Sequence, residues 1–131
     1  MSEKIINSKC MGRYQLGWTM DDLKKEIYGD YTEESLENHY TLTTENLKFW
    51  ILKEREVISQ IMAFGSYSGK FLECIGIGNN MLDLSRIGVR YNKEDYVYTL
   101  QDYPGICFEL EDIEEWNELT APIEYISIFN V

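Results

Sequence analysis

The stretch Leu16-Gly17-Trp18-Thr19-Met20-Asp21-Asp22-Leu23 has a counterpart in Ile77-Gly78-Asn79-Asn80-Met81-Leu82-Asp83-Leu84. Both place an apolar residue, a glycine and a residue that can cap a helix before Met, and both end on Asp-Leu, at a constant offset of 61 residues. Because the side chains of Thr and Asn accept hydrogen bonds from the first turn of a helix, each stretch predicts a helix start. An ordered internal repeat constrains the architecture before any functional motif is considered.

Downstream segments repeat in the same order, and residues 47–51 and 106–110 share the alternation expected of a half-buried strand. The matched segments are residues 39–42 with 97–100, 47–51 with 106–110, and 58–64 with 123–129. We therefore expect an α+β fold in which two αβββ half-repeats, approximately 14–65 and 70–131, form an antiparallel meander sheet with helices packed on one face. We expect a single domain over residues 1–131. An alternative is one continuous sheet with two helices that curls into a partly closed barrel.

The local signals predict the individual elements. Thr19 is expected to cap a first helix that ends before Gly29, Thr32 a second, and Asn80 a third that ends before Gly88. Pro104-Gly105 is typical of a type II turn. The expected strands cover residues 40–43, 47–53, 57–64, 70–77, 89–91, 96–100, 106–110 and 123–129, with turns at 44–46, 65–69, 92–95 and 102–105.

Charge is the second informative feature. The chain of 131 residues has 12 Lys and Arg against 23 Asp and Glu, a net charge of −11. Residues 1–65 hold 8 basic and 11 acidic residues (net −3), whereas residues 66–131 hold 4 and 12 (net −8). Such a field repels phosphate backbones, so we expect no direct nucleic-acid binding, and it attracts basic macromolecules. The competing interpretation is that the acidity serves solubility alone.

The cysteines and the hydropathy bear on location. Cys10, Cys74 and Cys107 are odd in number and have no CxxC spacing, which is typical of a reduced, cytoplasmic protein. No apolar run exceeds four residues, so we expect no membrane insertion. We expect a cytoplasmic monomer.

Catalytic motifs are missing from the sequence. It has one histidine, His39, and no GxSxG, GxxxxGK[ST] or GxGxxG pattern, and no close Cys/His spacing for zinc. Gly76-Ile77-Gly78 lacks the third glycine of a dinucleotide loop and is read as a turn before a helix. We therefore expect no catalytic residues, no metal and no cofactor. The alternative is a small hydrolase or lyase that uses carboxylates on the open face of the sheet.

The strongest binding signal lies between residues 109 and 118, which hold six acids, no base and Trp116. An aromatic anchor in an acidic rim suits a basic protein partner; the competing interpretation is a solvated loop with Trp116 folded onto the core. Two turns, 94–96 and 102–103, repeat the pairing of acids with Tyr, and the meander would make one acidic face if it placed them together. The candidate partner-binding residues are Glu94, Asp95, Asp102, Tyr103, Glu109, Glu111, Asp112, Glu114, Glu115, Trp116 and Glu118.

Two resemblances follow from these patterns. The repeated helix-plus-meander plan is similar in topology to β-lactamase inhibitory protein and its relatives, which bind proteins. The segments Tyr103-Pro104-Gly105-Ile106-Cys107-Phe108-Glu109-Leu110 and Ile123-Glu124-Tyr125-Ile126-Ser127-Ile128-Phe129 resemble the ends of small acidic immunity proteins that neutralise polymorphic or contact-dependent growth-inhibition toxins. The second resemblance implies a cytoplasmic partner toxin, often a basic nuclease, held by non-covalent contacts.

Overall fold

A computed structural model describes residues 3–131 and contains two β-sheets and two short helices. The fold is mostly β, and its large sheet is antiparallel throughout. The helices are α1 (Met20–Glu26) and α2 (Met81–Arg86). The strands are β1 (Lys4–Ile6), β2 (Cys10–Met11), β3 (Tyr14–Gln15), β4 (Thr32–Ser35), β5 (His39–Thr43), β6 (Leu47–Leu52), β7 (Val57–Ala63), β8 (Lys70–Phe71), β9 (Tyr91–Glu94), β10 (Val97–Leu100), β11 (Tyr103–Leu110) and β12 (Ile123–Phe129).

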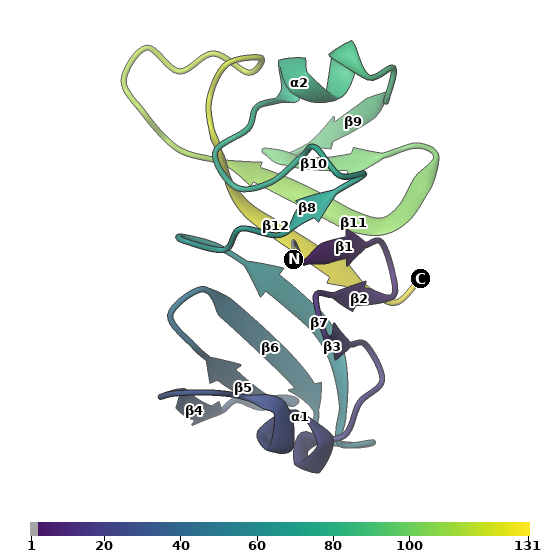
Figure 1. Cartoon of the computed structure of the whole chain (residues 1–131), viewed down its shortest axis with the longest axis vertical. Coiled ribbons are helices and arrows are strands. Elements are labelled where there is room, and N and C mark those ends of the chain that lie inside the picture. The colour runs from purple at the N-terminus through teal and green to yellow at the C-terminus, as the bar shows by residue number, and fades with distance from the viewer. Residues whose placement is uncertain (1–2) are drawn as a thin grey trace.

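The large sheet has eight strands in the order β4-β5-β6-β7-β12-β11-β10-β9. Each half is a meander of four consecutive strands that follows its own helix, and the halves join where β7 pairs with β12 (Figure 1). On each side of this central pair, the strands run from the last strand of the half to its first. The sheet is thus continuous, as the alternative expectation required, but it ends in two edge strands, β4 and β9, and does not close.

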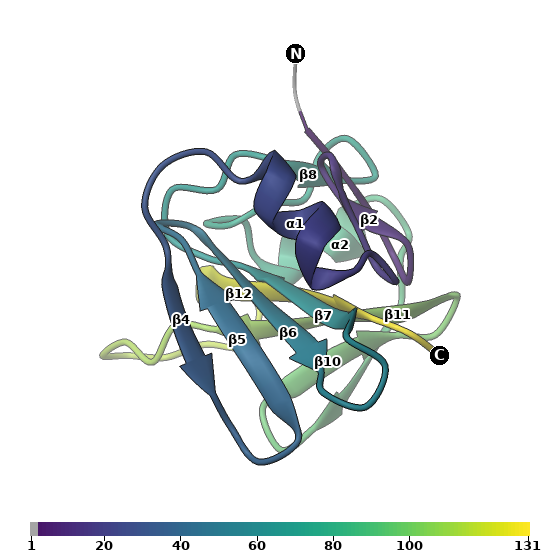
Figure 2. The ribbon, with the colours of Figure 1, turned by 90° about the horizontal axis from the view of Figure 1, so that it is seen from below.

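A small sheet, in the order β3-β2-β1-β8, lies with both helices on one side of the large sheet (Figure 2). Its edge strands contribute one aromatic ring to each half. The ring of Tyr14 lies 5.0 Å from that of Phe49, and the ring of Phe71 lies 6.3 Å from that of Phe108. Because both phenylalanines are fully buried, this layer completes one core that spans the two halves. We call the opposite, uncovered side of the large sheet the open face.

The two helices begin in the same way. The side chains of Thr19 and Asn80 accept a hydrogen bond from the backbone N–H of Asp22 and Asp83, and these carboxylates accept one in return from the capping residue's own N–H. Two orphan donors are satisfied at each helix start by this capping box. The predicted caps of both helices are confirmed.

The glycines before the caps join each helix to the last strand of its half. The backbone N–H of Gly17 (φ 90°) donates to the Ile58 carbonyl, and that of Gly78 (φ 93°) donates to the Ile123 carbonyl, both at 2.9 Å. Each isoleucine N–H donates back to the residue after the glycine. A positive φ in this range favours glycine. The repeated glycine therefore reports a shared helix-to-strand connection.

The structure differs from the expected αβββ units because a fourth strand opens each meander. Residues 32–38 were predicted to be helical, yet Thr32–Ser35 is strand β4, with Glu33 opposite Leu42. The segment has a capping residue but no apolar stripe, and all four strand residues are exposed. A helix here would have no apolar face to bury. The backbone N–H and C=O groups of the segment instead form hydrogen bonds with β5.

Three other expectations need correction. The strand predicted at 70–77 ends at Phe71, because Leu72 and Glu73 take positive φ angles of 53° and 64°. The turn predicted at 92–95 is shifted to Asp95 and Tyr96, and β9 runs through Glu94. The turn predicted at 102–105 does not include Gly105. This residue lies inside β11, where a side chain would collide with Ser8. Strands β1, β2 and β3 had not been predicted.

The register also corrects one part of the repeat. The sequence match aligns Leu42 with Leu100, but Leu42 pairs with Phe49 as Tyr98 pairs with Phe108. The equivalent residue of Leu42 is therefore Tyr98, two positions away. Because side chains alternate with a period of two, this slip leaves the face unchanged and is invisible in the apolar pattern.

Candidate partner-binding site

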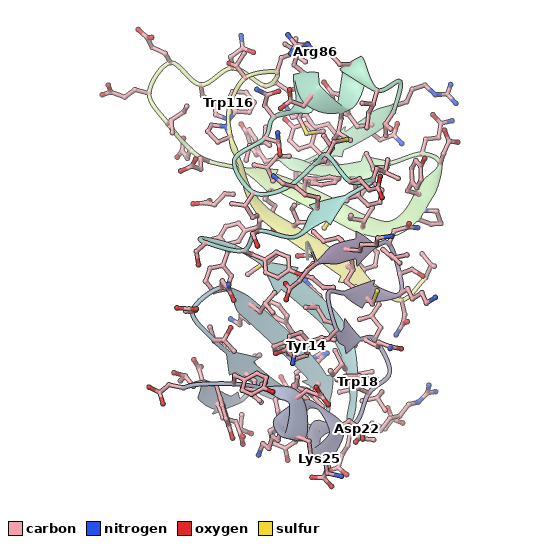
Figure 3. The ribbon with its side chains drawn as sticks, viewed as in Figure 1. Tyr14, Trp18, Asp22, Lys25, Arg86 and Trp116 are labelled. Atoms are coloured by element: carbon pink, nitrogen blue, oxygen red, sulfur yellow. The ribbon has the colours of Figure 1, made fainter. Side chains whose placement is uncertain are left out.

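The β9–β10 turn and the connection between β11 and β12 meet at one corner of the second half. The rings of Tyr96 and Trp116 pack edge to face with centroids 6.2 Å apart. Figure 3 shows Trp116 at the far end of the molecule from Trp18 and Asp22. We call residues 94–96 together with residues 111–118 the acidic corner.

Lys93 and Glu118 connect the two segments of the corner. The Lys93 ammonium lies 5.2 Å from the ring centroid of Tyr96 and 5.4 Å from that of Trp116, and 3.3 Å from a Glu118 carboxylate oxygen. Cation–π attraction and the ion pair act on the same ammonium. Lys93 therefore holds the two aromatic side chains against each other.

Glu118 also accepts two phenolic hydrogen bonds. Tyr98 donates at 3.0 Å and Tyr91 at 3.1 Å. The hydrogen bond from Tyr98, followed by those from Lys93 and Tyr91, holds the pKa of Glu118 below its ordinary value. Burial, then the Glu118 carboxylate, raises the pKa of both tyrosines. Ionised Glu118 therefore ties the connection to strands β9 and β10.

The outer side of the acidic corner combines apolar and acidic groups. Tyr96 is 69% exposed and Ile113 is 43% exposed. Within residues 3–131, no Lys or Arg lies within 4.0 Å of a carboxylate in the segment 111–115. Exposed rings and uncompensated carboxylates are features that a basic protein partner complements.

A hollow opens beside Trp116. It has a volume of about 480 Å³ and is lined by Tyr96, Leu110, Asp112 and Trp116. The two rings come from different segments, so the hollow exists only because the turn and the connection meet. Its lining combines aromatic surface with a single carboxylate.

The structure brings some of the predicted residues together. Asp112 and Trp116 line the hollow, and Glu118 lies against Lys93. The predicted residues Glu94, Asp95, Glu111, Glu114 and Glu115 belong to the same two segments by sequence, and the backbone N–H of Glu111 donates to the Pro122 carbonyl at the base of the connection. Asp102 and Tyr103 lie at the opposite end of β10, where Asp102 is 3.7 Å from Arg90 and the ring of Tyr103 packs on Phe71 at 5.3 Å. The single face that would have included both turns is therefore not formed.

Glu109 belongs to the open face. It pairs with Val97 across one strand boundary, and Val97 pairs with Glu94 across the next. By the alternation of the strands, the three side chains share a row on the open face. Val97 therefore lies between the two carboxylates of this row.

Sequence reasoning missed the residues whose contacts hold the two segments of the acidic corner together. Tyr96 lay in a recognised acidic turn without being included as a candidate, and Lys93, Tyr91 and Tyr98 were assigned only to strands or turns. The sequence has no Asn-Gly or Asp-Gly motif here, and only the pairing of Glu94 with Val97 in the structure places Tyr96 at the tip of a hairpin. The pairing of that tip with Trp116 has no local signature.

Residues 3–131 include no cluster of three or more His, Cys, Asp or Glu side chains placed to hold a metal ion. Over the same residues, neither helix has the length and apolar character needed to cross a membrane.

Comparison with known proteins identifies a similar fold. No family model matches the sequence, and no curated protein matches it. Among solved structures, the uncharacterized protein YfeY from Escherichia coli is similar, with a TM-score of 0.58 and 8% sequence identity. The match covers 99% of this chain and 100% of YfeY. At this identity, the likeness concerns the fold alone.

Proposed function

We propose that this protein is an immunity or inhibitor protein that binds a basic toxin, with a nuclease as the expected class, through its acidic corner. The observation that carries the proposal is the meeting of Tyr96 and Trp116 beside a connection whose carboxylates in residues 111–115 make no ion pair within the described chain. Aromatic anchors supply contact area, and the carboxylates accept charge-assisted hydrogen bonds from Lys and Arg. The net charge of −8 in residues 66–131 would speed the encounter.

The proposal predicts that the protein encoded immediately upstream ends in a basic domain, and the direct test is co-purification of this chain with that domain. We expect a complex whose dissociation constant rises with ionic strength, because the attraction is electrostatic in part. Neutralisation of the toxin by the chain, measured on the toxin's own substrate, would accompany binding. Failure of the two proteins to associate at low ionic strength would contradict the proposal.

The site is tested by reversing charges at the corner. The variant Glu111→Lys, Asp112→Lys, Glu114→Lys and Glu115→Lys should bind the basic domain at least about 100-fold more weakly, since several charged contacts become repulsive. It should also lose most of the salt dependence.

A matched control separates the site from the overall charge. The variant Asp30→Lys, Glu34→Lys, Glu37→Lys and Glu45→Lys changes the net charge equally, at exposed positions of the first half. It should retain a dissociation constant within about tenfold of the unmodified protein, because distant exposed charges act mainly on encounter. Equal losses in both variants would show that the acidic corner has no special role.

A further inference from the structure

The hollow beside Trp116 has the chemistry of a site for one guanidinium group. The rings of Tyr96 and Trp116 line the hollow, a planar cation stacks on the face of such a ring, and Asp112 supplies a carboxylate for paired hydrogen bonds. We propose that this hollow receives a single arginine side chain from the protein partner, as the contact that fixes the partner's position. This inference rests on the proposed function and identifies the chemistry of its central contact.

Lys93 shows that these two rings attract a cation. Its ammonium lies within 5.2 and 5.4 Å of their centroids, yet Lys93 does not line the hollow. Glu118 lies 3.3 Å from the same ammonium and balances its charge. Asp112 is therefore the carboxylate that faces an incoming cation, and within residues 3–131 it makes no ion pair.

The turn that carries Tyr96 is an unfavourable place for a large side chain. Asp95 and Tyr96 are the two central residues of the β9–β10 hairpin and take φ angles of 47° and 67°. A two-residue turn with both φ angles positive favours Gly at its second position. Because the Tyr96 side chain is 69% exposed, burial does little to offset this strain. The strained backbone therefore keeps the Tyr96 ring exposed to solvent, as expected for a residue that contacts a partner.

Arginine suits this hollow better than lysine does. Its guanidinium is planar and stacks on aromatic rings, while its fork of donors matches one carboxylate. An ammonium is a compact, strongly hydrated charge and gains less from two rings that meet at 77°. The expected preference is therefore arginine over lysine, and both over a neutral side chain.

The test uses the peptide acetyl-Gly-Gly-Arg-Gly-Gly-amide and two analogues in which lysine or citrulline replaces the arginine. NMR spectra follow the indole N–H signals of Trp18, Trp50 and Trp116 during titration at millimolar peptide. We expect a saturable shift of the Trp116 signal with arginine, a smaller one with lysine and none with citrulline. Trp50 is an internal control, because Lys48 lies 4.9 Å from its ring centroid while the hollow is elsewhere.

Variants show whether the arginine peptide binds in the hollow. Asp112→Asn and Tyr96→Gly should each weaken arginine-peptide binding by roughly tenfold, since each removes one charge-assisted or cation–π contact. Glu34→Gln, an exposed residue of the first half that does not line the hollow, should leave binding unchanged. An unsaturable Trp116 shift, or equal shifts with arginine and citrulline, would overturn the inference.

The two proposals fail in different ways. If the arginine peptide binds as expected but the upstream basic domain does not associate, the hollow is an arginine site and the immunity function is wrong. If the basic domain binds tightly and Asp112→Asn and Tyr96→Gly leave its affinity unchanged, the inhibitor function stands and the arginine contact is wrong.

Discussion

The connection before the last strand differs sharply between the two halves of the large sheet. In the first half, four residues (53–56) join β6 to β7; in the second half, twelve residues (111–122) join β11 to β12. The strands on either side are alike, because both pairs have a register shift at the same place, before Ile51 and before Leu110. Two similar frameworks thus carry a short polar turn in one case and the acidic corner in the other.

The difference separates structural positions from candidate functional ones. Residues that agree between the halves are buried or cap a helix, such as Phe49 and Phe108, or Thr19 and Asn80. Residues that differ carry exposed charge and aromatic surface. We therefore expect changes at shared positions to lower stability in both halves alike, and changes in the longer connection to act mainly on binding.

The largest expected effect is the loss of a core ring. Phe49→Ala and Phe108→Ala should each lower the free energy of unfolding by about 3–5 kcal/mol, because each removes a fully buried aromatic side chain. Chemical denaturation measures both values. If one variant lowered the free energy of unfolding by less than about 1 kcal/mol and the other by the full amount, the two halves would not be structurally equivalent.

Removing either helix cap should lower the free energy of unfolding by a smaller amount, which is the same in the two halves. Thr19→Ala and Asn80→Ala each remove the acceptor of a capping box and should cost about 1 kcal/mol of unfolding free energy. Thr19→Ser and Asn80→Asp retain a capping oxygen and serve as controls. If the alanine variants unfold at the same denaturant concentration as these controls, the caps do not stabilise the helices.

Tyr96→Gly should leave stability nearly unchanged. Relief of a left-handed backbone at a non-glycine residue favours the variant by about 1–2 kcal/mol, while loss of the packing between rings costs about 0.5–1.5 kcal/mol. We expect a melting temperature within a few degrees of the unmodified protein. A large fall in melting temperature would make Tyr96 a structural residue and remove its strain as an argument for binding.

Glu118 should make a pH-dependent contribution to stability. Its pKa is lower in the folded chain than the ordinary value of 4.5, so ionised Glu118 stabilises the fold above that pH and loses this contribution as pH falls through the folded pKa. Glu118→Gln should therefore be less stable than the unmodified protein at pH 7, with the difference shrinking toward pH 3. Denaturation at both values checks this, with exposed Glu114→Gln as the control. A difference that grows on acidification would contradict the assigned role.

Local patterns predict the part of the fold that local physics determines. The capped helices and strands β6, β7 and β12 follow from capping residues and period-two alternation. The strands β1, β2, β3 and β8 have only two or three residues each, too short for a periodic signal. Strand β4 has no apolar face at all, so only its pairing with β5 reveals it.

The candidate site was predictable to a similar extent. The acidity of residues 109–118 and the presence of Trp116 are visible in the sequence. The contact of Trp116 with Tyr96, and the support of both rings by Lys93, depend on how separate segments pack. The same packing places Asp102 at the far end of β10, although its sequence context resembles that of Asp95.

The most direct test of the functional division between the open face and the acidic corner compares Trp50→Ala with Trp116→Ala. Each tryptophan is half-buried and has a lysine near its ring, but Trp50 lies on the open face. Calorimetric titration of each variant with the upstream basic domain gives the two dissociation constants. We predict a rise of at least about 30-fold for Trp116→Ala, as for an interface hot spot, and less than about threefold for Trp50→Ala. A larger loss in Trp50→Ala would place binding on the open face and contradict the account.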